Sequence, residues 1–300
     1  MEKQRNKKGS LPIGVRIIGI IIAVLAAAYG LYAGMGNSTG NFDGEMQIFA
    51  LDVGQGDSFF IISPNGKTML IDSGESSNSK QIEQFIREKG VRQLDVVIAS
   101  HTHSDHVGSM PYLLDAFDVG KYVMSEAGLE TRIQKRINAV LEEKDIPCSY
   151  VWAGDVIDWD SDCKVTVLSP VPEFDEYSKT DWNEWSLIIR AEYANHSMIF
   201  TGDATVRSEQ AAMLNNEKYL FDADVLKVPH HGSTTSSSLG FLEAVSPEYA
   251  IISVGKGNSY GHPDYDTIQK LKQVNAEIYR TDELGTINIV FSADDIKITY

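Results

Sequence analysis

Three of the seven histidines of this chain lie within the six-residue segment HTHSDH at positions 101–106. His101 and His103 are two residues apart, so in an extended loop both imidazoles project to the same side and can reach one cation. Asp105 and His106 follow directly, and a turn there would direct them at a second, neighbouring cation. Nitrogen and oxygen donors without sulfur favour Zn, Mn or Fe. The segment therefore predicts two metal sites.

The same arrangement, an apolar run followed by a cluster of polar residues, recurs along the chain. The four examples are LDVGQGD (51–57), IASHTHSDH (98–106), IFTGDA (199–204) and VLKVPHHG (225–232). Polar residues at the carboxyl ends of buried strands are where sites assemble in sheet-containing folds. We therefore expect the four clusters to meet at one site.

Interleaved strands and helices must position these clusters. Apolar and alternating runs predict strands at 46–53, 58–63, 67–72, 94–100, 121–125, 165–169, 186–193, 197–203, 224–229, 249–255, 286–292 and 296–300. Helical spacing of apolar residues predicts helices at 79–89, 109–116, 130–144, 207–215, 238–244 and 265–274. The run at 94–100, directly before HTHSDH, is nearly continuous and so typical of a strand buried on both faces.

The segment HTHSDHVG resembles the signature of the metallo-β-lactamase superfamily. This resemblance implies an α/β (α+β) fold, a four-layered αββα sandwich, over residues 45–300, and a binuclear hydrolase. It also supplies later ligands: Asp203 matches the aspartate that usually bridges both metals, and His231 the final histidine of the second metal. The implied metal ligands are His101, His103, Asp105, His106, Asp203 and His231, around two divalent ions, Zn or Mn.

Three longer segments resemble one particular branch of this superfamily. LDVGQGDS (51–58), LKVPHHGS (226–233) and SVGKGNSYGHP (253–263) are similar to the extracellular, C-terminal domain of ComEC-type competence proteins and its stand-alone relatives. The resemblance implies hydrolysis of phosphodiesters by a metal-activated hydroxide, with DNA as a candidate substrate. A phosphorylcholine or teichoic-acid esterase of the cell surface and a non-catalytic metal-binding module remain alternatives. The segments supply no evidence for a protein partner.

One feature departs from the superfamily pattern, which usually places a third histidine of the first metal between HTHSDH and Asp203. The single histidine there, His196, lies in YANHSM, which is typical of a hairpin turn, and we expect it at the surface. In the ComEC-like pattern Asn183 of WNEWS is the matching position. A neutral amide binds a cation more weakly than imidazole, so the first site is expected to be weak.

The resemblance also implies supporting and catalytic roles. Asp57 and Asp72 are expected to orient metal ligands, although a tight turn and a solvated strand end are the alternatives. Adjacent side chains of a strand face opposite ways, so of the HHG pair we expect His231 as ligand, and His230 as a second metal contact only if the strand has ended. The expected catalytic residues are Asp105, Asp203, His230 and His262, with a histidine protonating the departing oxygen.

The serine- and threonine-rich segment STTSSS at 233–238 follows the HHG pair. It is typical of a helix cap, but its backbone N–H groups could also receive an anion. Ser233, together with His262, is therefore a candidate substrate contact.

The charge of the chain is distributed unevenly. Residues 1–16 hold five bases and one acid, whereas the rest holds 21 bases and 41 acids, a formal charge of −20. Affinity for nucleic acid that is independent of sequence comes mainly from Lys and Arg, so an acidic body argues against tight binding of this kind. It does not exclude a nuclease whose metal ions meet the phosphate.

An uncharged apolar run occupies residues 17–35 and would extend about 28 Å as a helix, enough to span a bilayer. With the basic residues 1–16 before it, it predicts a cytoplasmic N-terminus, a single-pass signal anchor at 17–35, a linker at 36–44 and an extracytoplasmic domain. A cleaved signal peptide, which would make the protein secreted, is the alternative. In an extracytoplasmic domain, Cys148 and Cys163 would either form a disulfide or stay as two thiols.

Overall fold

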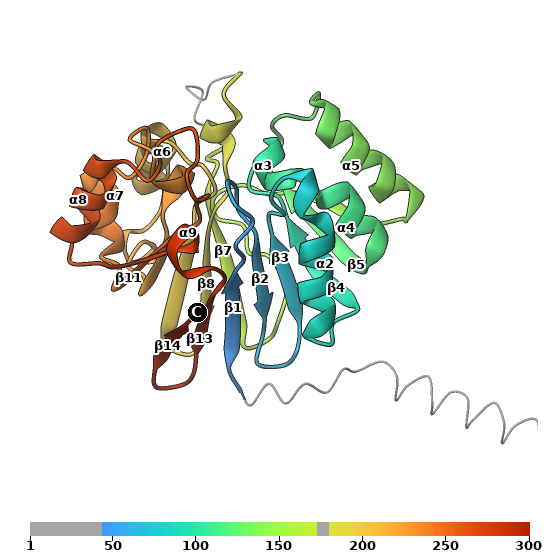
Figure 1. Cartoon of the computed structure of the whole chain (residues 1–300), viewed down its shortest axis with the longest axis horizontal. Helices are drawn as coiled ribbons and strands as arrows, with labels where there is room; N and C mark the ends of the chain where they lie inside the picture. Colours follow the sequence, from blue (N-terminus) through green and yellow to red (C-terminus); the bar gives the residue numbers. More distant parts are fainter. Residues whose placement is uncertain (1–43, 173–179) are drawn as a thin grey trace, which may run out of the picture. The chain divides into compact units, whose positions relative to one another are not determined.

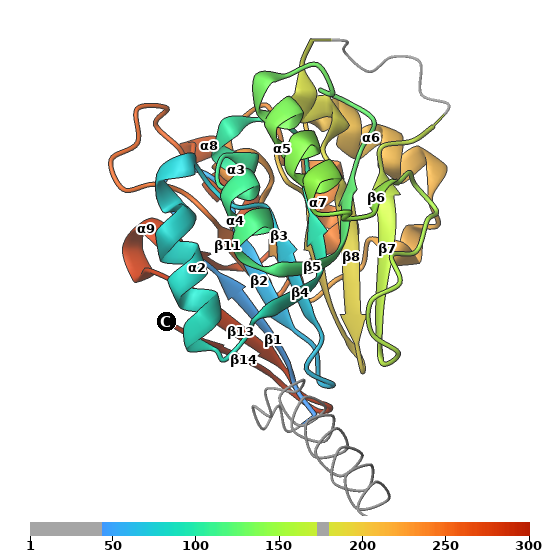
Figure 2. The ribbon, with the colours of Figure 1, turned by 90° about the vertical axis from the view of Figure 1, so that its right-hand side faces the viewer.

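The computed structural model describes residues 44–172 and 180–300 of the chain. Two β-sheets stack face to face, and helices cover the outer face of each (Figures 1 and 2). This is the four-layered αββα sandwich that the sequence predicts.

The first sheet contains eight strands in the order β14-β13-β1-β2-β3-β4-β5-β6. Their bounds are β1 Met46–Ala50, β2 Phe59–Ile62, β3 Thr68–Ile71, β4 Gln93–Ile98, β5 Asp118–Met124, β6 Cys148–Tyr150, β13 Ile287–Phe291 and β14 Ile296–Thr299. Its outer face carries the helices α2 Ser79–Glu88, α4 Met110–Ala116 and α5 Arg132–Glu143.

The second sheet contains six strands in the order β12-β11-β10-β9-β8-β7. Their bounds are β7 Cys163–Ser169, β8 Ile188–Tyr193, β9 His196–Phe200, β10 Val225–Lys227, β11 Tyr249–Ile252 and β12 Glu277–Arg280. Its outer face carries α6 Val206–Asn215, α7 Leu239–Val245 and α8 Tyr265–Gln273. Shorter helical segments are η1 Ser76–Asn78, α3 Ser104–Val107, η2 Trp182–Trp185, η3 Lys218–Leu220, η4 Pro229–Gly232 and α9 Thr281–Leu284.

The alternation of side chains along the strands divides the core into layers. Ile48 of β1 and Phe59 of β2 face the core between the sheets. The ring of Phe59 packs edge to face on that of Phe200 of β9, with centroids 5.3 Å apart. Phe49 and Phe60, the next residue along each strand, pack instead among the residues under α2, α4 and α5. At about 1.5–3 kcal/mol for each large apolar side chain buried, these layers supply the main stabilisation of the sandwich.

The strand directions bring the polar clusters to one edge of each sheet. In the first sheet β3 and β4 are parallel with Ile71 opposite Ile98, and β2 is antiparallel to β3 with Phe59 opposite Ile71. The residues that precede β2 and those that follow β3 and β4 therefore share an edge. In the second sheet β9, β10 and β11 are parallel, so the residues after each of them also share an edge.

Most differences from the predicted elements are at their ends. The predicted strand 197–203 ends at Phe200, because Thr201 and the residues after it leave the sheet. The histidine loop contains one helical turn, α3, which the sequence pattern does not reveal. Strand β6 was missed because it has three exposed residues and no alternation of apolar and polar side chains.

The predicted cytoplasmic segment 1–16, the membrane segment 17–35 and all but Gly44 of the linker 36–44 lie outside the described residues. Within residues 44–172 and 180–300, no helix combines the length and the apolar character needed to cross a membrane.

Both cysteines carry free thiols, Cys148 in β6 and Cys163 in β7. Burial raises the pKa of the Cys163 thiol to about 12 and also raises that of Cys148. Of the two alternatives for this pair, the structure has the unpaired thiols.

Candidate metal centre

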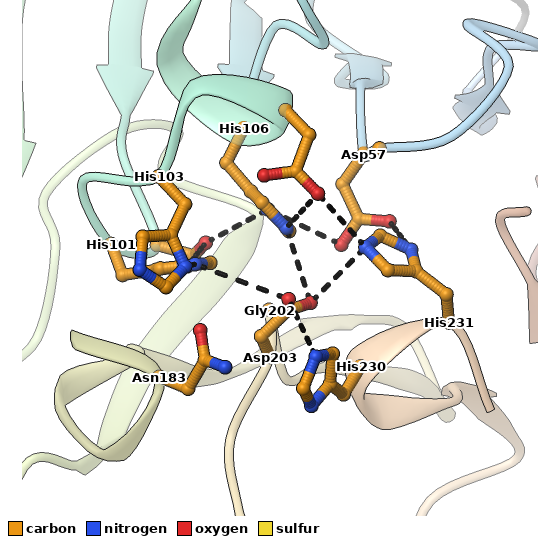
Figure 3. Close-up of polar contacts among 12 residues, drawn as sticks. Asp57, His101, His103, His106, Asn183, Gly202, Asp203, His230 and His231 are labelled. Carbon is orange, nitrogen blue, oxygen red and sulfur yellow. Dashed lines mark hydrogen bonds and ion pairs between the residues drawn. The ribbon is translucent and has the colours of Figure 1, made fainter. Parts of the chain in front are cut away.

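Four of the predicted ligands converge closely at the edge described above (Figure 3). Asp203 Oδ1 lies 3.1 Å from His106 Nε2 and 3.5 Å from His231 Nε2, and Asp105 Oδ2 lies 3.6 Å from His231 Nε2. One potential ligand atom from each of the four residues lies within 4.8 Å of the other three. This set corresponds to the predicted second metal site.

The other carboxylate oxygen of Asp203 faces a different set of nitrogens. Asp203 Oδ2 lies 4.0 Å from His101 Nε2 and 3.5 Å from His230 Nε2. His101 Nε2 in turn lies 3.1 Å from His103 Nδ1. Asp203 therefore stands between two groups of imidazoles, one at each oxygen, which is the position of a carboxylate that bridges two cations.

Buried atoms that make no hydrogen bond at the second site fit a cation. His106 Nε2, His231 Nε2 and Asp203 Oδ1 are all buried and have no hydrogen-bond partner among the described residues. The three atoms face one another at 3.1 and 3.5 Å without the geometry of a hydrogen bond, so their bonding capacity is not used within the protein alone. A divalent cation with nitrogen and oxygen ligands would satisfy all three, so these residues fit the implied metal.

The HHG segment presents both of its histidines to the site because strand β10 has ended. Lys227 is the last residue of β10, and His230 and His231 have left-handed backbone conformations with φ of 51° and 53°. The strict alternation of a strand therefore does not apply to them. His231 is buried and faces Asp203 Oδ1, whereas His230, with 22% of its side chain exposed, faces Asp203 Oδ2.

The first site is more open than the second. His196 begins β9 and packs against Phe291, with ring centroids 5.6 Å apart, and it does not line the cleft that holds the site. Asn183 does line that cleft, and its Oδ1 is buried without a hydrogen-bond partner. Around His101 and His103, the described residues form no cluster as tight as that of the second site. Asn183 and His230 are the two groups placed to complete this site (Figure 3).

Supporting contacts orient the second-site imidazoles. His106 Nδ1 lies 2.8 Å from Asp72 Oδ2, and His231 Nδ1 lies 2.8 Å from the carbonyl oxygen of Ser253. Since a carbonyl only accepts, Nδ1 of His231 carries a proton, so the neutral ring presents the lone pair of Nε2 toward the site. Asp72 is buried and also accepts from the N–H and hydroxyl of Ser100. The alternative of a solvated strand end at Asp72 is therefore wrong.

The loop LDVGQGD is both a tight turn and a support for the site. Gly56 has φ of 135°, and a Cβ there would lie 2.2 Å from the carbonyl oxygen of Asp105, so only glycine allows this approach. The N–H of Asp57 donates to the same carbonyl at 3.2 Å. The turn thereby fixes the backbone of a predicted metal ligand.

Lys227 is a site residue that the sequence reasoning missed. Its ammonium is buried, 2.5 Å from Asp57 Oδ2, and donates to the carbonyl oxygen of Gly202 at 2.8 Å. Asp57 also lies 3.6 Å from His106 Nδ1 and 3.5 Å from His231 Nδ1. The available signal was a single lysine within the apolar run VLKVP, because buried lysines are rare unless paired.

The cluster holds more carboxyl groups than cationic side chains. Asp57, Asp72, Asp105 and Asp203 lie around the second site, whereas Lys227 is the single lysine or arginine paired with any of them among the described residues. An excess of negative charge in a buried cluster favours bound cations. The composition of the cluster therefore agrees with the fit of its geometry to a metal.

The pKa shifts follow the same charges. Burial alone would lower the pKa of His106, but Asp203, Asp105 and Asp72 outweigh it and hold that pKa well above its usual value. Burial alone would raise the pKa of Asp203, but His106 and His231 hold it well below its usual value. Burial lowers the pKa of His101 and of His230, which leaves both as neutral lone-pair donors. The ionised Asp203 and the neutral His101 and His230 are in the forms that bind metals, whereas the raised pKa of His106 and of His231 means that a cation would displace protons from these two rings on binding.

Ser233 lies away from the cleft surface, contrary to the prediction of a substrate contact. It is only 5% exposed, does not line the cleft, and its hydroxyl lies 3.0 Å from Thr235 Oγ1. The prediction failed because the segment turns inward. Ser238 does cap α7, accepting from the N–H of Phe241 at 3.3 Å.

The place predicted for an external anion near this cap holds a carboxylate of the protein. The buried Glu209 accepts from the N–H groups of Ser237 at 2.6 Å and Ser238 at 2.9 Å. These donors are therefore not free for substrate.

The site opens into a cleft of about 280 Å³. Besides predicted metal ligands, its lining includes Gln55, Ser104, Asn183, Tyr260 and His262. His262 lies beside His230, with ring centroids 5.9 Å apart, and its Nδ1 is 3.2 Å from Asp264 Oδ2. The cleft thus brings both predicted proton-transfer histidines next to the metal ligands.

Comparisons with known proteins agree with this architecture. A profile of the metallo-β-lactamase superfamily matches residues 51–256. The chain is 34% identical over 260 residues to ComE operon protein 3 of Bacillus subtilis, covering 81% of this chain and 33% of that protein. It is 29% identical over 257 residues to Recombination protein 2 of Haemophilus influenzae, covering 84% and 30%. The chain thus spans about a third of the length of these curated relatives.

A solved structure shows the same fold. YhfI from Bacillus subtilis, a metallo-beta-lactamase fold protein, superposes with a TM-score of 0.53 at 13% identity, covering 85% of this chain and 99% of that one. Together with the His and Asp cluster, these matches confirm the resemblance drawn from HTHSDHVG and the ComEC-like segments. The chain belongs to the metallo-β-lactamase superfamily of metal-dependent hydrolases and, within it, is ComEC-like.

Proposed function

We propose that this metallo-hydrolase cleaves phosphodiesters. The observation that carries the proposal is the place of Asp203, whose two oxygens face separate sets of imidazoles at the base of one cleft. When bound, a pair of divalent cations would acidify a water molecule and offset negative charge on a phosphate. His106, His231, Asp105 and Asp203 would hold one cation; His101, His103 and Asp203 would hold the other, together with His230 or Asn183.

The remaining residues of the cleft would position substrate and move a proton. Partial burial lowers the pKa of His230, so this ring is better suited to donate a lone pair than a proton. His262 is therefore the candidate to protonate the departing oxygen, and the carboxylate of Asp264 lies 3.2 Å from its Nδ1. Lys227 and Asp57 would not contact substrate. They would hold Gly202 and the second-site imidazoles in place.

Nucleic acid is the first candidate substrate, supported by similarity to proteins named for the ComE operon and for recombination. A phosphorylcholine or teichoic-acid esterase is the second candidate. It is favoured by one observation: among the described residues, no lysine or arginine lines the cleft, so a long polyanion gains little from basic side chains there. A metal-binding module without turnover is the third.

One panel of assays separates these candidates. Protein loaded with Zn or Mn is tested on bis(p-nitrophenyl) phosphate, single-stranded and duplex DNA, and a phosphorylcholine ester. We expect the protein to turn over the model diester and DNA. EDTA should abolish this turnover, and added metal should restore it. His103→Ala should abolish turnover, whereas His196→Gln, a histidine outside the cleft, should retain it. Hydrolysis of the choline ester alone supports the second candidate, and bound metal without turnover supports the third.

We also propose that the domain works outside the cytoplasmic membrane, held by residues 17–35. The support is the uncharged apolar run and the basic residues that precede it. Protease added to intact cells should digest the domain; complete protection, with digestion only after lysis, would contradict this location.

A further inference from the structure

An exposed tyrosine stands at the rim of the metal cleft. Tyr260 lines the cleft with the predicted ligands, and 70% of the residue is exposed. Its ring is nearly parallel to that of His262, with centroids 5.8 Å apart and an interplanar angle of 12°. A ring so exposed buries little apolar surface and adds little to folding stability, but it is free to contact a ligand.

The loop around Tyr260 is fixed by one side chain. Asn258 Oδ1 accepts from the N–H groups of Tyr260 and His262, each at 3.1 Å. Asn258 Nδ2 donates to the carbonyl oxygens of His262 at 2.7 Å and Gly255 at 3.0 Å. The loop that presents the ring is thus held in place before any substrate binds, which lowers the entropic cost of binding.

The composition of the cleft limits what this ring can recognise. Apart from histidines, Tyr260 is the single aromatic residue in the described lining, and no lysine or arginine accompanies it there. Cages for quaternary ammonium groups combine several aromatic rings around the cation. One flat ring, already stacked on an imidazole, instead suits another flat ring, such as a nucleobase.

We infer that Tyr260 is a specificity-determining residue that stacks on the nucleobase next to the scissile phosphodiester. This inference rests on the proposed function, since it names what the phosphodiesterase holds beside the reacting phosphate. Stacking on a free base face requires an unpaired strand, because duplex bases already stack on one another. The preferred substrate is therefore a single-stranded nucleic acid or a nucleotide diester.

The test compares base-bearing and abasic oligonucleotides of the same length on metal-loaded protein. Tyr260→Ala should raise KM for the base-bearing strand by about 5- to 150-fold, the range for loss of one stacked base, and leave the abasic strand unchanged. Tyr260→Phe should behave as wild type, because it keeps the ring. Tyr219→Ala is the matched control, since Tyr219 is 68% exposed but lies outside the cleft lining.

Two kinetic outcomes would overturn the inference. An equal loss on both strands would mean that Tyr260 supports the loop and not a base, and a loss confined to a phosphorylcholine ester would assign the ring to choline. Should wild-type protein cleave no phosphodiester, the proposed function fails, and fluorescence anisotropy of the same labelled strands then decides the inference alone. Binding that depends on bases and is lost in Tyr260→Ala supports it; binding indifferent to bases overturns it.

Discussion

Replacing Asp203 by Asn is expected to lower kcat/KM for a phosphodiester by about 10³-fold or more. Within residues 44–172 and 180–300, Asp203 is the one residue whose two oxygens reach both sets of imidazoles, at 3.1 and 3.5 Å on one side and 3.5 and 4.0 Å on the other. Asparagine keeps the shape but offers one neutral oxygen. Metal ions supply several kcal/mol of transition-state stabilisation, and each 1.36 kcal/mol is worth tenfold in rate.

The control for this variant is Asp224→Asn. Asp224 precedes β10, at the end of the strand away from the HHG segment, and accepts from the N–H of Ser197 at 2.8 Å. It should retain turnover close to that of wild type. Circular dichroism checks that both variants are folded. A folded Asp203→Asn protein that keeps wild-type turnover would remove the bridging carboxylate from the mechanism.

Replacing Lys227 by Met is expected to destabilise the protein by about 3–5 kcal/mol. The change removes the ammonium that lies 2.5 Å from the buried carboxylate of Asp57 and leaves that carboxylate only the ring nitrogens of His106 and His231, at 3.6 and 3.5 Å. It also removes the donor to the carbonyl oxygen of Gly202. Urea unfolding in EDTA measures the loss without a contribution from metal binding.

Two further variants make the test specific. Adding Asp57→Asn to Lys227→Met should recover part of the lost free energy of unfolding, because the unpaired buried charge is then absent. Lys67→Met is the matched control: its ion pair with Asp95 is also short, 2.9 Å, but Lys67 is 52% exposed. An exposed pair contributes about 1 kcal/mol at most. Equal losses for Lys227→Met and Lys67→Met would show that burial of the pair is unimportant.

The sequence predicts most of the metal centre because its signals are local. HTHSDH brings four donors together within six residues, and the clusters after apolar runs mark the edge where strands end. The buried faces of β1 and β2 follow from simple alternation. These features depend on neighbours in the chain, and so they can be read without knowing the tertiary structure.

What could not be predicted depends on contacts between distant segments or on backbone angles. Lys227 and Asp57 pair across two sheets, so neither residue reveals its partner. The left-handed φ of His230 turns it toward Asp203, where a strand would have turned it away. Ser233 matches a substrate contact by type, but its neighbours bury it. In each case the local pattern is compatible with several environments and the fold selects one.

Anomalous scattering from crystals soaked in Zn or Mn tests the central claim most directly. We predict two peaks at the Asp203 carboxylate, one beside His106, His231 and Asp105 and the other beside His101 and His103. The second site should be occupied first as metal is titrated, because its four ligand atoms already lie within 4.8 Å of one another. Crystals that diffract well after soaking but show no anomalous peak in the cleft would contradict the account.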